Sequence, residues 1–217
     1  MQEYKNIILV SHCLLNELAV VKNDAGRKDN LSLIKNLMKM NVGIFQLPCP
    51  ENRMYGPNRW GSVYEQFDNN FYRNNSRDLL SPIVNEISDY IKDGVNFLGV
   101  IGIDGSPSCG IGLTCKSEEF KGEISAIKDI AHCVNSVEMT DDKGVFMEEL
   151  EKLFEKKKID AKFYGYNDEN VDEITEKIEE SIKNNAFWMR YFCFHLQHSF
   201  YSFIKQRNYG ASYYFVH

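Results

Sequence analysis

Several features that mark common protein classes are missing from this 217-residue sequence. No run approaches the ~18 apolar residues that a membrane-spanning helix needs, so we expect no membrane span. The first residues, Met-Gln-Glu-Tyr-Lys-Asn, contain no charged region followed by an apolar one, as a secretory signal would. We therefore expect a cytoplasmic protein in a reducing compartment. Its six cysteines then serve as ligands, catalysts or core residues rather than disulfides.

An excess of positive charge is absent as well. Lysine and arginine number 25 against 31 aspartate and glutamate, which gives a formal net charge of −6. A nucleic-acid-binding domain usually carries a basic surface, so we expect no nucleic-acid partner. This charge balance fits a protein that acts on a small molecule, and it is compatible with a homodimer.

Several chemical motifs are missing too. No Cys-x-x-Cys pair occurs, which argues against a thioredoxin-like site and a typical zinc ribbon. No Gly-x-Gly-x-x-Gly or Walker loop occurs either. A phosphatase-like loop would place arginine six residues after its cysteine, but Ala19 and Tyr55 stand there after Cys13 and Cys49.

What the sequence does contain is an alternation of strand-like and helix-like segments. The strand-like runs are apolar, and the helix-like runs repeat their apolar residues with helical spacing. This rhythm predicts a three-layer αβα, Rossmann-like α/β domain with a mostly parallel sheet of at least four strands. The expected strands are 6–12, 42–48, 96–103 and 159–166. The expected helices are 29–40, 76–93 with Pro82 in its first turns, 145–157 and 168–183. Segment 51–75 is polar and aromatic, and we expect an irregular cover over the strand ends.

The composition changes after residue 184. Residues 185–217 are rich in aromatic side chains and contain no Asp or Glu. We therefore assign 1–184 to the α/β domain and 185–217 to a C-terminal tail. The tail is either a partner-binding or membrane-surface helix, or an appendage without a selected role.

Three cysteines each follow an apolar run, and these are the most informative residues. Cys13 follows the first expected strand, Cys49 the second and Cys109 the third. Parallel strands end at one edge of a sheet, where open α/β sheets bind their ligands. Three converging thiols without a fourth partner indicate a metal or iron–sulfur centre with one open position. We interpret Cys115 and Cys133 as small core residues instead.

The neighbours of these cysteines suggest specific roles. Ser106-Pro107-Ser108-Cys109-Gly110 predicts a tight turn whose amides approach a ligand closely. Glu51 is either a general acid or base, or a carboxylate that stabilises a helix N-terminus. His12 either lowers the pKa of a thiol or is a hydrogen-bonded structural residue.

Three spaced motifs resemble the thiouracil desulfidase family and its relatives, many of them long classed as a domain of unknown function. The motifs are Ser11-His12-Cys13-Leu14-Leu15, Cys49-Pro50-Glu51 and Ser106-Pro107-Ser108-Cys109-Gly110. The resemblance covers about residues 6–183. Two features differ: the stretch after Leu15 lacks an arginine-and-glycine pattern, and Ser76 stands where relatives often carry cysteine.

The resemblance implies a [4Fe–4S] cluster held by Cys13, Cys49 and Cys109, with Glu51 and Ser106 as catalytic residues. The implied reaction removes sulfur from a thiocarbonyl compound, such as a thiolated pyrimidine, to give the carbonyl and sulfide. The covering segment offers candidate substrate contacts: Arg53, Arg59, Trp60 and Tyr64.

Two other functions remain open at this stage. One is a non-catalytic iron–sulfur or metal-binding module for sensing or storage. The other is a metal-free cysteine hydrolase, in which a base such as His12 or His132 would have to reach a thiol.

Overall fold

The computed structural model describes residues 5–22 and 31–185. The chain divides into two compact units, Met1–Lys177 and Ile178–His217. The first unit contains all candidate site residues. The predicted tail, 185–217, lies outside the described residues except for Asn185, and so does Cys193.

The first unit is built on a parallel four-stranded sheet, as the sequence predicts. Its order is β2 (Val42–Gln46), β1 (Asn6–Val10), β3 (Asn96–Ile103) and β6 (Phe163–Tyr166). The central strands are apolar on both faces because helices cover both sides. In β1, Ile8, Leu9 and Val10 are fully buried.

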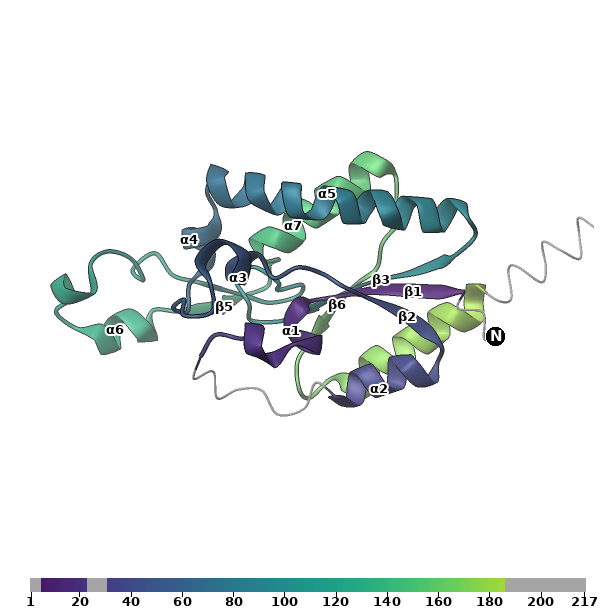
Figure 1. Ribbon diagram of the computed structural model, residues 1–217. Coiled ribbons are helices and arrows are strands. Elements are labelled where there is room, and N and C mark those ends of the chain that lie inside the picture. Colours follow the sequence, from purple (N-terminus) through teal and green to yellow (C-terminus); the bar gives the residue numbers. More distant parts are fainter. Residues whose placement is uncertain (1–4, 23–30, 186–217) are drawn as a thin grey trace, which may run out of the picture. The chain divides into compact units, whose positions relative to one another are not determined.

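Helices form a layer on each face of this sheet (Figure 1). One layer contains α5 (Asn70–Lys92) and α7 (Val145–Lys157). The other contains α2 (Leu31–Lys39) and a helix that begins at Val171. A hydrogen bond from Asn36 to Thr175 (3.2 Å) joins these last two helices. This arrangement confirms the predicted three-layer α/β architecture.

The covering segment 51–75 is more regular than predicted. It contains α3 (Pro50–Tyr55) and α4 (Tyr64–Phe67), and α5 already begins at Asn70. The Asn69 side chain accepts the backbone N–H of Tyr72 (3.0 Å) and so caps α5. Pro82 therefore lies in the helix interior and not in its first turns.

A second, small sheet was not predicted. It pairs β4 (Thr114–Lys116) with β5 (Glu138–Thr140) in antiparallel fashion, and α6 (Ile130–Asn135) lies between them in the sequence. Two short 3-10 helices, Glu17–Ala19 and Ile124–Ala126, were also missed. The predicted strands 6–12 and 42–48 were each two residues too long, and 159–166 began four residues too early. The first strand ends at Val10 because α1 (His12–Leu15) starts one residue later.

No helix among the described residues is long and apolar enough to cross a membrane.

Candidate functional site

The candidate site is a cavity of about 550 Å³ at the carboxyl ends of the strands. β1 lies between β2 and β3 in the sheet. The chain therefore passes from β1 to β2 on one side of β1, and it later adds β3 on the other side. Such a switch point is where open parallel sheets bind ligands. Residues that follow β1, β2 and β3, together with Tyr166 of β6, line the cavity.

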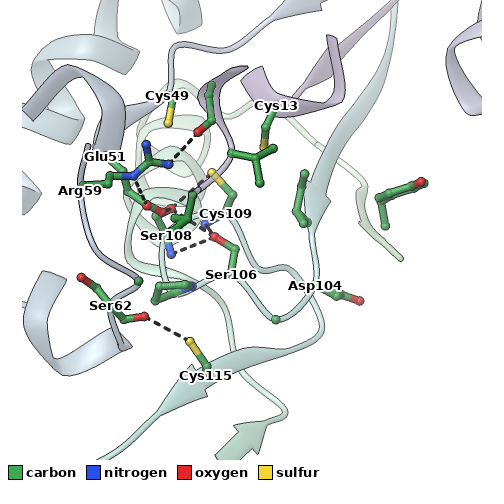
Figure 2. A pocket seen from close by; sticks show the side chains of 18 of the residues that line it. Cys13, Cys49, Glu51, Arg59, Ser62, Asp104, Ser106, Ser108, Cys109 and Cys115 are labelled. Carbon is green, nitrogen blue, oxygen red and sulfur yellow. Dashed lines mark hydrogen bonds and ion pairs between the residues drawn. The ribbon is translucent and has the colours of Figure 1, made fainter. Parts of the chain in front are cut away.

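Cys13, Cys49 and Cys109 all line this cavity; we call them the strand-end thiols (Figure 2). Cys13 lies in the first turn of α1. The thiol of Cys49 caps α3 by accepting the N–H of Asn52 (3.3 Å). Cys109 lies in the loop after β3. The structure therefore brings together three thiols that are separated by up to 96 positions in the chain.

The surroundings of Cys49 and Cys109 disfavour negative charge on these two thiols. Burial raises the pKa of Cys49 to about 11, although the N–H of Asn52 opposes the shift. Burial also raises the pKa of Cys109, and the neighbouring Cys13 and Cys49 add to the effect. A cation that replaces the protons would stabilise the thiolates together, as bound metals do.

The Cys109 loop is held rigidly from two sides. The Ser106 hydroxyl accepts the backbone N–H groups of Ser108 (3.3 Å) and Cys109 (3.0 Å). The first N–H groups of α7 donate to the same loop: Val145 to the carbonyl of Pro107 and Phe146 to that of Ser108, both at 3.0 Å. These bonds satisfy helix-terminal donors and fix the loop backbone.

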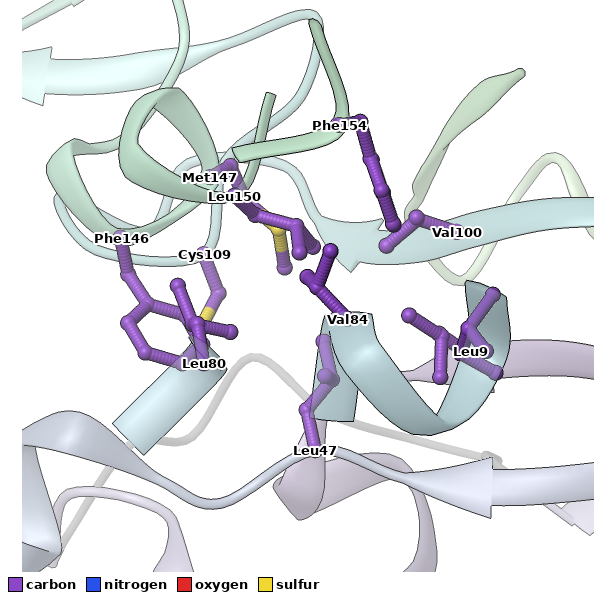
Figure 3. Packing of buried hydrophobic residues seen from close by; sticks show 11 residues of the cluster. Leu9, Leu47, Leu80, Val84, Val100, Cys109, Phe146, Met147, Leu150 and Phe154 are labelled. Atoms are coloured by element: carbon purple, nitrogen blue, oxygen red, sulfur yellow. The ribbon is translucent and has the colours of Figure 1, made fainter. Parts of the chain in front are cut away.

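Cys109 also belongs to the hydrophobic core. Its thiol lies near Leu80 and Phe146 in the cluster that α5 and α7 form with the sheet (Figure 3). Gly144 stands directly before α7, and a Cβ there would lie 2.4 Å from the carbonyl carbon of Ser108. The close approach of helix and loop therefore requires glycine at this position.

A buried carboxylate lies next to the thiols. Glu51 is 7% exposed, and its Oε2 accepts the Nε–H of Arg59 at 2.8 Å. Its Oε1 accepts the hydroxyl of Ser108, which lies 3.2 Å from the hydroxyl of Ser106. Both roles considered for Glu51 fit this geometry, because it lies in the first turn of α3 and its Oε1 also contacts a hydroxyl in the cavity wall.

Sequence reasoning missed three residues of this cavity. Ser108 contacts Glu51 directly, whereas the resemblance implied Ser106 as the catalytic serine of this motif. Asp104 Oδ1 accepts three backbone N–H groups of the next turn (3.2, 2.9 and 3.3 Å). Cys115 lines the cavity from β4, set apart from the strand-end thiols, and its thiol lies 3.5 Å from the Ser62 carbonyl.

Of the four candidate substrate contacts, only Arg59 lines the cavity. Arg53 is exposed, and Trp60 is 80% exposed. The Tyr64 hydroxyl donates to Glu148 (2.7 Å) and accepts from Arg73 (3.0 Å). Tyr64 thus belongs to an ion-pair network that joins α5 to α7.

The candidate bases of a cysteine hydrolase are engaged elsewhere. His12 Nδ1 donates to the Leu47 carbonyl (3.1 Å), and its Nε2 accepts from Asn16 (3.3 Å). His132 is exposed and lies 3.4 Å from a carboxylate oxygen of Glu119. Neither histidine lines the cavity. The raised pKa values of Cys49 and Cys109 also disfavour these two residues as free nucleophiles.

No group of three or more His, Cys, Asp or Glu in the described part of the chain is placed to hold a single metal ion. An iron–sulfur cluster has a different requirement, because each thiolate binds a different iron.

Fold and site together define an α/β protein with a thiol-rich cavity at the switch point of a parallel sheet. No family model matches the chain, and no solved structure matches it. Over 153 residues the chain is 35% identical to the "Uncharacterized protein MJ0003" of Methanocaldococcus jannaschii. The match spans 69% of this chain and 97% of the archaeal protein. The chain belongs to the same family as MJ0003.

Proposed function

We propose that this protein is an iron–sulfur-dependent desulfidase of the thiouracil desulfidase type. It would remove sulfur from a small thiocarbonyl compound, such as a thiolated pyrimidine. One observation carries the proposal: thiols from three strand ends line a single cavity beside the buried Glu51. In the net reaction, water supplies the oxygen of the new carbonyl, the C–S bond breaks, and hydrosulfide and a proton are released. The reaction needs no oxidant or reductant.

The residues present fit a [4Fe–4S] cluster held by the strand-end thiols. Thiolates are the usual ligands of such clusters, and three of them leave one iron open. The cavity volume falls in the range of small-molecule sites, about 300–1,000 Å³. When bound, the cluster supplies a Lewis acid that polarises the C=S bond.

Glu51 is the group that we assign to proton transfer. Arg59 holds one oxygen of the carboxylate, and the other faces the Ser108 hydroxyl. Ser108 can take a proton from the attacking water while it passes its own proton to Glu51 Oε1. Ser106 lies within hydrogen-bond distance of Ser108 and orients it. General base catalysis requires such contact with the proton donor, directly or through a relay.

A sensor or storage module would use the same thiols. It would have no need for a buried carboxylate that accepts the hydroxyl of Ser108, which in turn contacts Ser106, so we favour the enzyme. We expect anaerobically purified protein to contain iron and acid-labile sulfide, and to release sulfide from 2-thiouracil or a related thioamide. Cluster without turnover of any thioamide would support the sensor, and colourless, iron-free but active protein would support a hydrolase.

A further inference from the structure

Arg59 has one guanidinium nitrogen that its own protein leaves without an acceptor. Nε donates to Glu51 (2.8 Å), and Nη2 donates to the carbonyl of Ala19 (2.7 Å). Nη1 is buried and has no hydrogen-bond partner among residues 5–22 and 31–185. The whole side chain is only 6% exposed.

Such an atom is unusual in a folded protein. A guanidinium keeps its charge at all physiological pH values, and buried donors nearly always have an acceptor. Arg59 lines the cavity, and its guanidinium lies beside Cys49 (Figure 2). The N–H groups of Nη1 therefore still lack an acceptor, and a molecule in the adjoining cavity is the candidate to supply one.

The surroundings restrict the charge of that molecule. An acceptor for a cationic donor is best when it is anionic. Glu51 already neutralises the guanidinium, so a dianion such as sulfate would place two charges near a carboxylate. A monoanion meets less repulsion.

The surroundings also restrict its chemical type. The site is buried, so an anion must lose most of its water to reach Nη1. A guanidinium is itself weakly hydrated and suits a polarisable anion that is also weakly hydrated. Hydrosulfide and thiolate sulfur have this character, and a sulfur anion is what the proposed reaction releases.

We infer that Arg59 Nη1 binds the sulfur that leaves the substrate, as hydrosulfide. This inference rests on the proposed function. As water adds to the thiocarbonyl carbon and the C–S bond breaks, the sulfur keeps the electron pair of that bond and one proton. The second proton of water passes through Ser108 to Glu51. Arg59 then contacts both groups that have received a proton of the water: Glu51 through Nε and hydrosulfide through Nη1.

The test uses the full chain without a cluster, under anaerobic conditions. Thiocyanate, iodide and hydrosulfide are titrated separately, and NMR follows the side-chain N–H signals of Arg59. We expect saturable shifts with all three anions and much weaker shifts with sulfate at equal ionic strength. Arg59→Lys keeps the charge but loses the fork of donors, so it should weaken binding on the order of tenfold.

Arg77→Lys is the matched control, because Arg77 lies on α5 and does not line the cavity. It should bind thiocyanate like the wild type. If Arg59→Lys does not fold by near-UV circular dichroism, the wild-type preference for thiocyanate over sulfate decides. Arg59 signals that do not move, or that move equally with sulfate, would overturn the inference.

This measurement involves neither iron nor turnover, so the two proposals can fail separately. Saturable binding by a protein that never takes up iron would leave the anion site and remove the desulfidase. Turnover by a loaded enzyme whose Arg59 ignores all three anions would do the reverse.

Discussion

Replacing Gly144 with alanine should disturb the site without replacing any proposed ligand. Gly144 has φ −73° and ψ 153°, which alanine adopts without strain, so only the added methyl group matters. That Cβ would lie 2.4 Å from the Ser108 carbonyl carbon, 2.5 Å from its oxygen and 2.9 Å from the Cys109 nitrogen. Ordinary contacts between carbon atoms are about 3.5–4.0 Å, so loop and helix must separate by roughly 1 Å.

Two energies oppose each other in this variant. Loss of glycine flexibility in the unfolded chain stabilises by about 0.4–1 kcal/mol. Overpacking costs about 1–3 kcal/mol, and here the clash is with backbone, which gives way least easily. We therefore expect a net loss near 1–2 kcal/mol and a melting temperature lower by roughly 2–4 °C per kcal/mol. A 1 Å displacement of Cys109 should also lower cluster content, and turnover by on the order of 100-fold.

Urea unfolding followed by circular dichroism measures the first effect, and iron content measures the second. Gly61→Ala is the control for stability, because a Cβ at Gly61 meets nothing within 4 Å. A Gly144→Ala protein as stable as this control, with full iron content, would refute the reasoning about the contact of α7 with the Cys109 loop.

Three further predictions concern the thiols, the carboxylate and the ion-pair network. Serine at any one strand-end thiol should reduce iron content and activity together, whereas Cys133→Ser should retain both; equal iron in all four variants would reject the ligand set. Glu51→Gln should keep the iron but slow turnover on the order of 10²–10⁴-fold, and unchanged kinetics across a pH series would leave Glu51 only a structural role. Glu149 is 1% exposed; burial raises its pKa, but hydrogen bonds from Lys152, Arg73 and Arg77 outweigh this and lower it. Because a lowered carboxyl pKa adds stability above its unfolded value, wild-type protein should lose that contribution as pH falls below about 4.3. Glu149→Gln should cost about 1–3 kcal/mol at pH 7 and show a flatter acid limb in urea unfolding; parallel limbs for both proteins would contradict this assignment.

The sheet was predictable because burial on both faces leaves a direct trace in sequence. After Asn96, residues 97–103 are an unbroken run of apolar residues and glycine, and β3 has the predicted bounds. The helix 145–157 was equally clear, since its buried residues repeat with helical spacing and lysines follow at its end. These elements carry their own signal whatever surrounds them.

The elements that were missed depend on contacts distant in sequence. β4 and β5 have three residues each, too few for a pattern to emerge. α3 and α4 are also short, and isolated helices of such length are unstable without packing. The start of α5 was missed because its first turns are rich in asparagine and arginine, and Pro82 suggested a later beginning.

The site shows the same division. Cysteines after three strands could be assigned to one edge, because parallel topology fixes where strands end. The contact of Ser108 with Glu51 could not be foreseen, since 57 positions separate them. The arrangement of Arg59 depends equally on distant backbone, because one of its acceptors is the carbonyl of Ala19.

The position of Cys109 has a consequence for how the protein can be studied. One side of this residue belongs to the core with Phe146 and Leu80, and the other faces the cavity. A ligand bound only by the folded chain shifts the unfolding equilibrium by mass action, about 2.7 kcal/mol at a concentration 100 times its Kd. Here the ligand would contact Cys109, which belongs to the core cluster that packs α5 and α7 against the sheet, so binding would stabilise that core. A simple melting curve should therefore report occupancy of the cavity, and libraries of thioamides or metal–sulfur reagents can be screened by thermal stability before any reaction is known.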